Sequence, residues 1–195
     1  IGLAGSEDLL IYHYENDNIR FATQGQERVR ILNSGGLTFN ADTATANALD
    51  DYEEGTWTPT IDGTADNVDG VNYDTDVRFG RYTKIGDTVH LWGRMRTDSL
   101  TWFTTSTNPI YIGGLPFDGA NVIGNGTITF AGTVGYANNW DGDIPQYCAM
   151  TGGASDRIYL YYQASHGSSW SLINPNDTEG GSNGNDIMFQ ITYKV

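Results

Sequence analysis

The segment RFGRYTKIGDTVHLWGRMR, residues 78–96, carries the clearest fold signal in the chain. Its two halves alternate between apolar and polar residues, and the dipeptide Gly86-Asp87 between them is typical of a tight two-residue turn. The pattern predicts an antiparallel hairpin with strands at 78–85 and 88–96. We assign Trp92 in this hairpin, and Trp57 upstream of it, to the core. The face that His90 occupies depends on the register of the strands.

Similar short segments recur on both sides of this hairpin and are separated by glycine-rich stretches. The chain has 25 Gly and 12 Tyr among 195 residues and only 17% charged residues, which favours pleated strands joined by turns. We therefore predict that residues 56–195 form one all-β domain, a jelly-roll-like β-sandwich head. Its further strands are expected at 57–61, 110–112, 126–136, 147–150, 157–162 and 187–195.

Residues 1–40 consist of still shorter strands, and alternation places their apolar residues on one face and their arginines on the other. A sheet this small has one thin apolar face and is marginal alone, so identical copies are expected to cover it. Three copies around an axis are the economical arrangement, and we interpret 1–40 as a trimeric β-hairpin shaft. The strands are expected at 9–14, 18–23, 28–32 and 37–40, with Ile19, Phe21, Val29, Ile31, Leu37 and Phe39 on the apolar face.

Residues 41–55 lack the alternating pattern of the preceding strands, and we interpret them as a neck between shaft and head. Asp42 or Thr43 can cap a short alanine-rich helix whose small side chains suit a close approach of copies at an axis. The acidic run DDYEEG follows at 50–55. In a trimer these carboxylates would be repeated around the axis and could hold Ca²⁺ or Mg²⁺, although solvated carboxylates at a junction are the favoured interpretation.

The charge balance excludes several classes of partner. With 24 Asp and Glu against 10 Lys and Arg, the formal net charge is −14. Phosphate binding requires clustered cations, so neither nucleic acid nor an anionic membrane is expected as a partner. No stretch is long and apolar enough to span a bilayer. Cys148 is the single cysteine, so an intrachain disulfide is excluded, and we interpret it as a small buried side chain.

Three aromatic loops are the candidate receptor-binding sites. The loop NNWDGD at 138–143 places Trp140 beside Asp141 and Asp143, where an indole can stack on a sugar ring and carboxylates can bind its hydroxyls. Trp102 and Trp170 lie in two further loops rich in Ser and Thr, a composition typical of adaptable binding surfaces. The alternative for each tryptophan is a packed position, in a turn for Trp140 and at the sandwich end or a trimer interface for the other two.

Catalysis finds little support in the sequence. A Ser-His-Asp set could be assembled around His166, but three histidines and many serines supply such sets by chance. Pairs of carboxylates of the kind that cleave glycans also arise by chance among 24 acidic residues. No His or Cys cluster has zinc spacing, so we expect neither enzyme activity nor a bound cofactor or metal.

Four stretches of the chain resemble bacteriophage tail-fibre proteins. DLLIYHYENDNI at 8–19 is similar to a shaft motif, and ERVRILNSGGL at 27–37 resembles the repeat ERMRI-SSGN, with Val29 in place of Met and Gly36 in place of Asn. ALDDYEEGTWTP at 48–59 resembles a junction that leads into C-terminal heads, and it is the most specific of the four. GRYTKIGDTV at 80–89 with GLPF at 114–117 resembles phage head modules. Residues 118–195 carry no such motif.

This resemblance implies a homotrimer at the tip of a tail fibre that binds a bacterial surface polysaccharide or an outer-membrane protein, without catalysis. It implies a location in the virion tail after assembly in the host cytoplasm. Three heads per fibre would then act together through avidity. Two alternatives stay open: a polysaccharide depolymerase, which usually needs a longer β-helix than this chain provides, and a structural module that trimerises or terminates the fibre.

Overall fold

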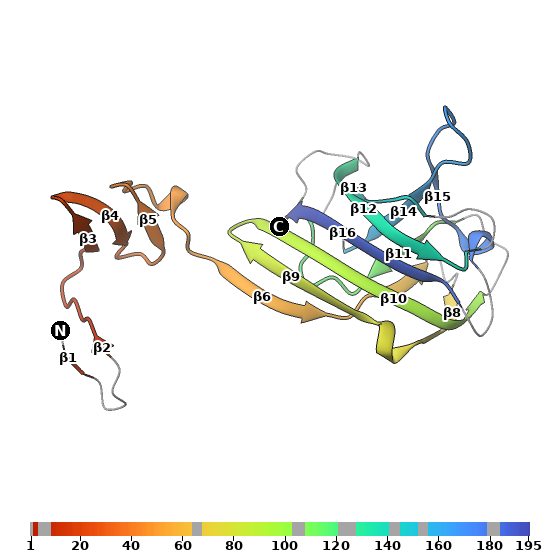
Figure 1. Cartoon of the computed structure of the whole chain (residues 1–195), viewed down its shortest axis with the longest axis horizontal. Helices are drawn as coiled ribbons and strands as arrows, with labels where there is room; N and C mark the ends of the chain where they lie inside the picture. The colour runs from red at the N-terminus through yellow and green to blue at the C-terminus, as the bar shows by residue number, and fades with distance from the viewer. Residues whose placement is uncertain are drawn as a thin grey trace. The chain divides into compact units, whose positions relative to one another are not determined.

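The computed structural model describes residues 2–3, 9–63, 68–102, 108–120, 128–140, 145–151, 156–178 and 184–195. The chain divides into two compact units, Ile1–Tyr52 and Glu53–Val195 (Figure 1). Regular structure in the described part is all-β apart from short 3-10 turns, as the composition predicted. No helix there has the length and hydropathy that crossing a membrane requires.

The first unit is built from short antiparallel strands. A three-stranded meander turns at Gln24-Gly25 and at Gly35-Gly36, where the backbone has positive φ. These turns lie where the sequence predicts them, while the strand predicted at 9–14 is shorter in the structure. A separate pair comprises β1 (Gly2–Leu3) and β2 (Leu9–Leu10), and the meander comprises β3 (Ile19–Thr23), β4 (Gln26–Ile31) and β5 (Leu37–Phe39).

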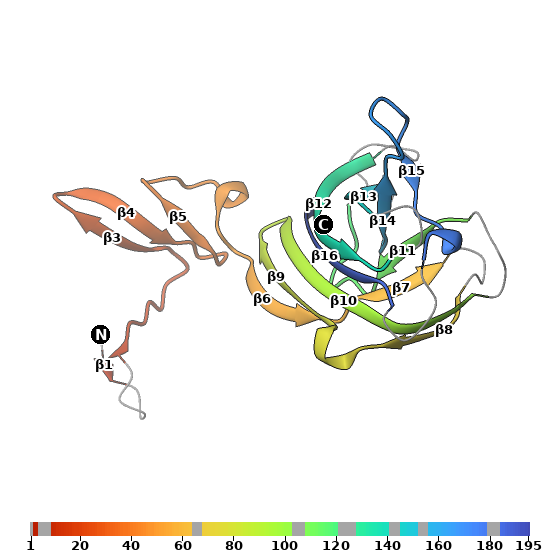
Figure 2. The same ribbon diagram turned by 45° about the vertical axis from the view of Figure 1, so that its right-hand side comes forward.

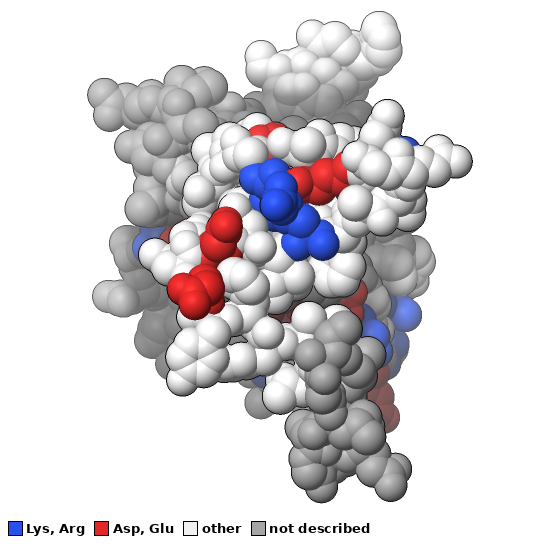
Figure 3. Space-filling view, turned by 90° about the vertical axis from the view of Figure 1, so that its left-hand side faces the viewer, with Lys and Arg blue, Asp and Glu red and all other residues white. Residues whose placement is uncertain are grey.

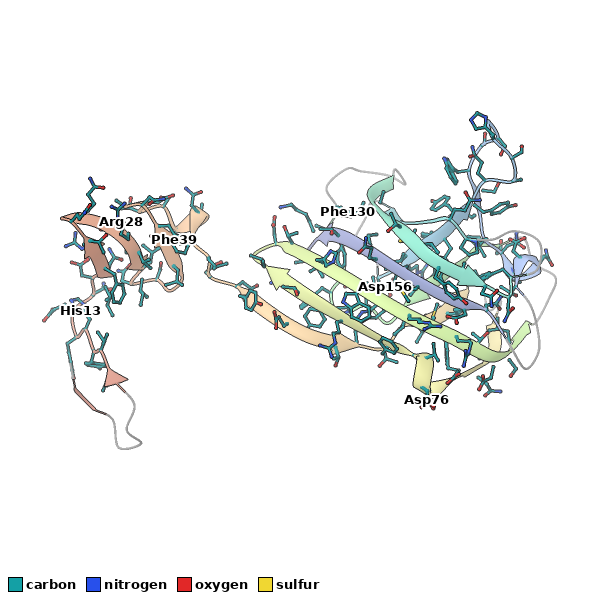
Figure 4. The ribbon with its side chains drawn as sticks, in the orientation of Figure 1. His13, Arg28, Phe39, Asp76, Phe130 and Asp156 are labelled. Atoms are coloured by element: carbon teal, nitrogen blue, oxygen red, sulfur yellow. The ribbon has the colours of Figure 1, made fainter. Side chains whose placement is uncertain are left out.

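The meander leaves an aromatic row exposed on its apolar face. The register places Phe21 opposite Val29 and Val29 opposite Phe39, which confirms the predicted alternation. Phe21 is 45% exposed and Phe39, labelled on β5 in Figure 4, is 51% exposed. Arg30 binds Glu27 through two contacts of 2.7 and 2.8 Å, and this hydrogen bonding lowers the pKa of the glutamate. Figure 3 shows basic and acidic side chains next to one another on the face that it draws.

The predicted helical neck is wrong for the described structure. Residues Thr45–Asn47 form a single 3-10 turn, which Asp42 stabilises by accepting a hydrogen bond of 2.8 Å from the backbone N–H two residues later. A helix cannot continue from this turn because Leu49 returns to β5 and exchanges two backbone hydrogen bonds with Leu37, of 2.8 and 2.9 Å. The pairing of distant backbone groups therefore overrides the local capping signal.

The second unit is an antiparallel sheet that bends over one core (Figure 2). Its strands follow the order β6-β9-β10-β16-β12-β13-β14-β11-β7, with β8 paired to β10 and β15 to β14. Apolar side chains of β10 and β16 meet those of β7, β11 and β14 in the core, an arrangement consistent with the predicted β-sandwich. The strands are β6 (Tyr52–Trp57), β7 (Thr60–Gly63), β8 (Val68–Tyr73), β9 (Phe79–Ile85), β10 (Thr88–Trp102), β11 (Ile110–Gly113), β12 (Ile128–Asn138), β13 (Tyr147–Thr151), β14 (Ile158–Tyr162), β15 (Ser171–Leu172) and β16 (Asp186–Lys194).

Two consecutive strands, β6 and β7, occupy the opposite ends of this strand order. The sequence predicted a single strand at 57–61, but the chain bends at Thr58-Pro59, where proline supplies no N–H for a ladder. β6 also begins at Tyr52, inside the acidic run that we had interpreted as neck. The bend lets one short segment of chain contribute to both edges of the sheet.

Trp57 anchors β6 to the core, as predicted. Its indole is 7% exposed, its Nε1 donates a hydrogen bond of 3.2 Å to the backbone oxygen of Trp92, and its ring packs edge-on against Phe189. Gly80 and Gly93, which are paired across β9 and β10, leave the space that the ring fills. A Cβ at Gly80 would lie 2.1 Å from Trp57 Nε1, so glycine is required for this close approach.

The β9–β10 hairpin forms where the sequence predicted it. β9 ends at Ile85 and β10 begins at Thr88, and Gly86 has the positive φ, 56°, that suits the first central residue of a tight turn. Asp87 in the turn accepts hydrogen bonds of 2.6 and 2.7 Å from Lys194 Nζ. The turn is thereby fastened to the end of β16.

Candidate functional site

The predicted site residue Trp170 stands on an exposed loop between β14 and β15, where it is 47% exposed. A compact turn braces the loop, because Ser168 Oγ donates a hydrogen bond of 2.8 Å to Ser165 O and Gly167 supplies a φ of 86°. His166, in the same turn, is exposed as well. The loop therefore presents an indole and an imidazole to solvent.

The predicted site residue Trp140 is packed instead. Its side chain is 8% exposed, and its Nε1 donates a hydrogen bond of 3.2 Å to the backbone oxygen of Asp186. The packed alternative describes this tryptophan, since an indole held in this way cannot stack on a sugar ring. The side chain of Trp102, and residues Asp141 and Asp143, lie outside the described residues.

Trp92 is exposed on the sheet, so its assignment to the core is wrong. The buried side chains of β10 nearest Trp92 are Val89, Leu91 and Met95, and Trp92 therefore points to the opposite, outer face, where it is 36% exposed. The signal was present in the sequence, because Trp92 alternates in phase with His90 and with the arginines of the same strand.

Trp92 belongs to a row of exposed side chains that crosses four strands. The register pairs Trp92 with Arg81 on β9 and with Gln190 on β16, and Gln190 in turn pairs with Thr133 on β12. Directly paired residues point to the same face, so a guanidinium, an indole, an amide and a hydroxyl stand side by side. All four residues are exposed, and the four strands lie next to one another in Figures 1 and 2. We call these four residues the Trp92 row.

Shallow hollows adjoin the Trp92 row on the outer face of the sheet. Trp92 lines two of them, with volumes of about 410 and 320 Å³. His90 is shared by the larger hollow and a third one of about 150 Å³, and Gln190 is shared by the second and the third. Figure 4 draws the side chains of these strands. The hollows therefore form one connected surface centred on the indole.

The charges on this surface differ in how they are compensated. Arg94, next to the row on β10, binds Asp186 through contacts of 3.1 and 2.8 Å, and this hydrogen bonding raises the pKa of the arginine. Arg81 makes no hydrogen bond or ion pair with any described residue. Glu54 lines the larger hollow beside Arg81 and has a partner of its own within the chain. Of these two arginines, Arg81 is therefore the one without a bonded partner among the described residues, in a chain whose net charge is −14.

Neither His90 nor His13 is paired with a carboxylate, and the described residues hold no metal-binding group. His90 Nδ1 lies 2.9 Å from the hydroxyl of Thr192, and His13 Nδ1 lies 3.1 Å from the backbone oxygen of Glu15, so neither imidazole is oriented by a carboxylate. No group of three His, Cys, Asp or Glu able to hold a metal ion occurs in this part of the chain. Burial raises the pKa of the Cys148 thiol to about 12, which leaves it protonated at neutral pH.

The fold of this chain is similar to that of a phage tail protein. No protein-family model matches the sequence, and neither does any curated protein. The crystal structure of the Dettilon tailspike protein matches with a TM-score of 0.53 and 14% sequence identity, over 73% of this chain and 24% of that chain. At this identity the likeness concerns the fold alone, a phage tail-related fold, and the chain corresponds to about a quarter of the tailspike.

Proposed function

We propose that this chain is the receptor-binding part of a phage tail fibre or tailspike and that it works as a homotrimer, without catalysis. Its ligand in this proposal is a polysaccharide or an outer-membrane protein on the bacterial surface. The tail-related fold, shared with a tailspike over 73% of the chain, carries the proposal. Trp170 is the predicted site residue whose exposure supports it, and Trp102, Asp141 and Asp143 belong to the same proposal.

The exposed aromatic row of the first unit supports self-association. Phe21 and Phe39 are about half exposed although they lie on the apolar face of their sheet. Fully burying an exposed phenylalanine contributes roughly 1.5–3 kcal/mol, so covering the exposed half of each side chain contributes about 1 kcal/mol, and three copies would cover six of them. A symmetric arrangement of three copies covers this face without any other partner.

Replacing both Phe21 and Phe39 by serine is expected to convert a trimer into a monomer. The substitutions remove the apolar surface that copies would share and leave the strand ladder intact. Sedimentation equilibrium at micromolar concentration measures the outcome: three chain masses for the wild type and one for the double variant. Tyr14→Ser is the matched control, because Tyr14 is 86% exposed and lies outside the row. A monomeric wild-type chain would refute the trimer.

Binding to bacterial cells tests the function itself. The fluorescently labelled chain is expected to bind some strains of a diverse bacterial panel and not others, as measured by flow cytometry. Trp170→Ala is expected to lower the cell-bound signal about tenfold, because a few residues, often tryptophans, carry most of the binding energy of an interface. Ser169→Ala, an exposed neighbour in the same loop, serves as control. Binding that Trp170→Ala leaves unchanged would exclude this residue, and no binding to any strain would count against the function.

The likeness to a tailspike also admits a second candidate function, cleavage of a surface polysaccharide. The two candidates differ in what happens to the ligand. Incubating the bound polysaccharide with the chain and assaying new reducing ends separates them. We expect none, because the proposed role is binding alone.

A further inference from the structure

We propose that the Trp92 row is a binding surface for an anionic sugar ring of the receptor. In this arrangement the indole stacks on the ring, Arg81 pairs with its carboxylate or phosphate, Gln190 binds its hydroxyls, and Thr133 binds a hydroxyl of the next ring. The inference rests on the proposed function and adds to it a surface on the sheet, distinct from the Trp170 loop, and a class of ligand.

The chemistry of the row matches a sugar better than an apolar partner. A pyranose has C–H faces that stack on an aromatic ring and a rim of hydroxyls that needs donors and acceptors. Trp92 offers the first, and the amide and hydroxyl of Gln190 and Thr133 offer the second in the hollow of about 320 Å³. Paired residues on neighbouring strands are about 5 Å apart, so Gln190 lies within reach of a ring stacked on Trp92. Thr133 lies one strand further, about 10 Å from Trp92, where it can reach the next ring of a polysaccharide.

The indole is held in place before any ligand arrives. Phe79 packs edge-on against Trp92, with ring centroids 5.9 Å apart and planes at 90°. Two positions further along β10, and on the same face, Arg94 is fixed by Asp186, and its Cζ lies 5.6 Å from the centre of the Tyr136 ring. Side chains that are already ordered lose little entropy on binding, which favours stacking of a sugar ring on the indole.

The charge of Arg81 makes the ligand anionic. Arginine is suited to planar recognition of carboxylate or phosphate through paired hydrogen bonds. Arg94 on the same face is already neutralised by Asp186, whereas Arg81 has no partner among the described residues. The carboxylate nearest in strand order, Glu54 on β6, lies on the side of Arg81 away from Trp92 and is engaged within the chain. Glu54 lines the larger hollow together with Arg81, whereas no acidic residue lines the hollow on the β16 side of Trp92.

An array of purified bacterial polysaccharides, half acidic and half neutral, tests the inference with the full chain. Wild type is expected to bind acidic members. Trp92→Ala is expected to weaken binding at least about tenfold, and Arg81→Gln about fivefold. Arg28→Gln makes the same change of net charge in the first unit, where Arg28 Nε donates a hydrogen bond of 3.1 Å to Thr23 Oγ1, and is expected to bind like wild type. Circular dichroism and sedimentation confirm that each variant keeps its fold and mass.

Removing the charge from the bound polysaccharide completes the test. Carboxyl reduction neutralises a uronic acid, and acid dephosphorylation removes a phosphate. The treatment after which wild type and Arg81→Gln bind the polysaccharide equally well identifies the anion that Arg81 recognises. Wild-type binding by Trp92→Ala, a preference for neutral polysaccharides, or loss of oligomer mass in Trp92→Ala would each overturn the inference, the last by making the face a contact between copies. If treating the bacterial cells with protease abolishes binding, the receptor is a protein. That result would overturn the inference of a sugar ligand but leave the proposed receptor-binding function standing. Arg81→Gln, at an exposed position, keeps the test decisive if Trp92→Ala fails to fold.

Discussion

Gly80→Ala is expected to lower the unfolding free energy of the second unit by about 3 kcal/mol or more. The added methyl group would lie 2.1 Å from Trp57 Nε1 and 2.5 and 2.6 Å from two ring carbons, inside contact distance. The indole is buried against Phe189 and cannot retreat without opening the core. Overpacking typically costs 1–3 kcal/mol, and partial expulsion of a buried tryptophan approaches the 3–5 kcal/mol of its truncation.

Urea unfolding followed by tryptophan fluorescence measures this loss as a lower midpoint with an unchanged slope. Gly135→Ala in β12 is the matched control, since a Cβ there meets nothing within 4 Å. In a strand an unhindered glycine-to-alanine change stabilises by roughly 0.5–1 kcal/mol, so the two alanines should shift the midpoint in opposite directions. Equal midpoints for the two variants would show that the packing of Trp57 does not depend on the absence of a side chain at Gly80.

Arg94→Met is expected to destabilise the second unit by about 3 kcal/mol. The side chain of Asp186 is only 4% exposed, and the arginine that neutralises it is 30% exposed. Removing one member of a largely buried ion pair leaves the other charge without compensation, at a cost of about 3–5 kcal/mol, and the partial exposure of Arg94 places the effect near the lower end.

The double variant Arg94→Met with Asp186→Asn is expected to recover most of that stability, because no buried charge remains. Lys194→Met provides the contrast. The pair of Lys194 with Asp87 has side chains 47% and 59% exposed, and such pairs contribute less than about 1 kcal/mol. Thermal unfolding of the four proteins at one ionic strength gives the comparison. A loss in Arg94→Met no larger than in Lys194→Met would contradict the role given to burial.

Structural features that are determined by residues close together in the sequence were predictable. The turn at Gly86-Asp87 and the meander of the first unit follow from alternation and turn residues within a few positions. The helix expected after Asp42 failed because Leu49 pairs with Leu37, a contact that no local pattern reveals. The strand expected at 57–61 failed because Pro59 was placed inside it, although proline lacks the N–H that a paired strand needs.

The candidate site depended on which face of each strand meets the core. Trp92 and Trp57 are both tryptophans in strand patterns, yet one is exposed and the other buried, and only the phase of alternation distinguishes them. Trp140 lies in a polar loop, and its burial depends on Asp186, 46 positions later. Arg81 and Gln190 are 109 residues apart in the chain (190 minus 81), so the Trp92 row could not be assembled without the sheet order.

The position of β16 has a consequence for how the protein is made. Among the described strands, β16 joins β10 to β12 in the middle of the sheet, yet it is the last of them to be synthesised. A nascent chain on the ribosome therefore holds two halves with unpaired strand edges until residues 186–194 emerge. Such edges readily pair with other chains, and copies translated from the same messenger are close at hand. Completion of this sheet is a late, non-local event. Slow translation would therefore lengthen the time during which the unpaired edges can pair with other chains.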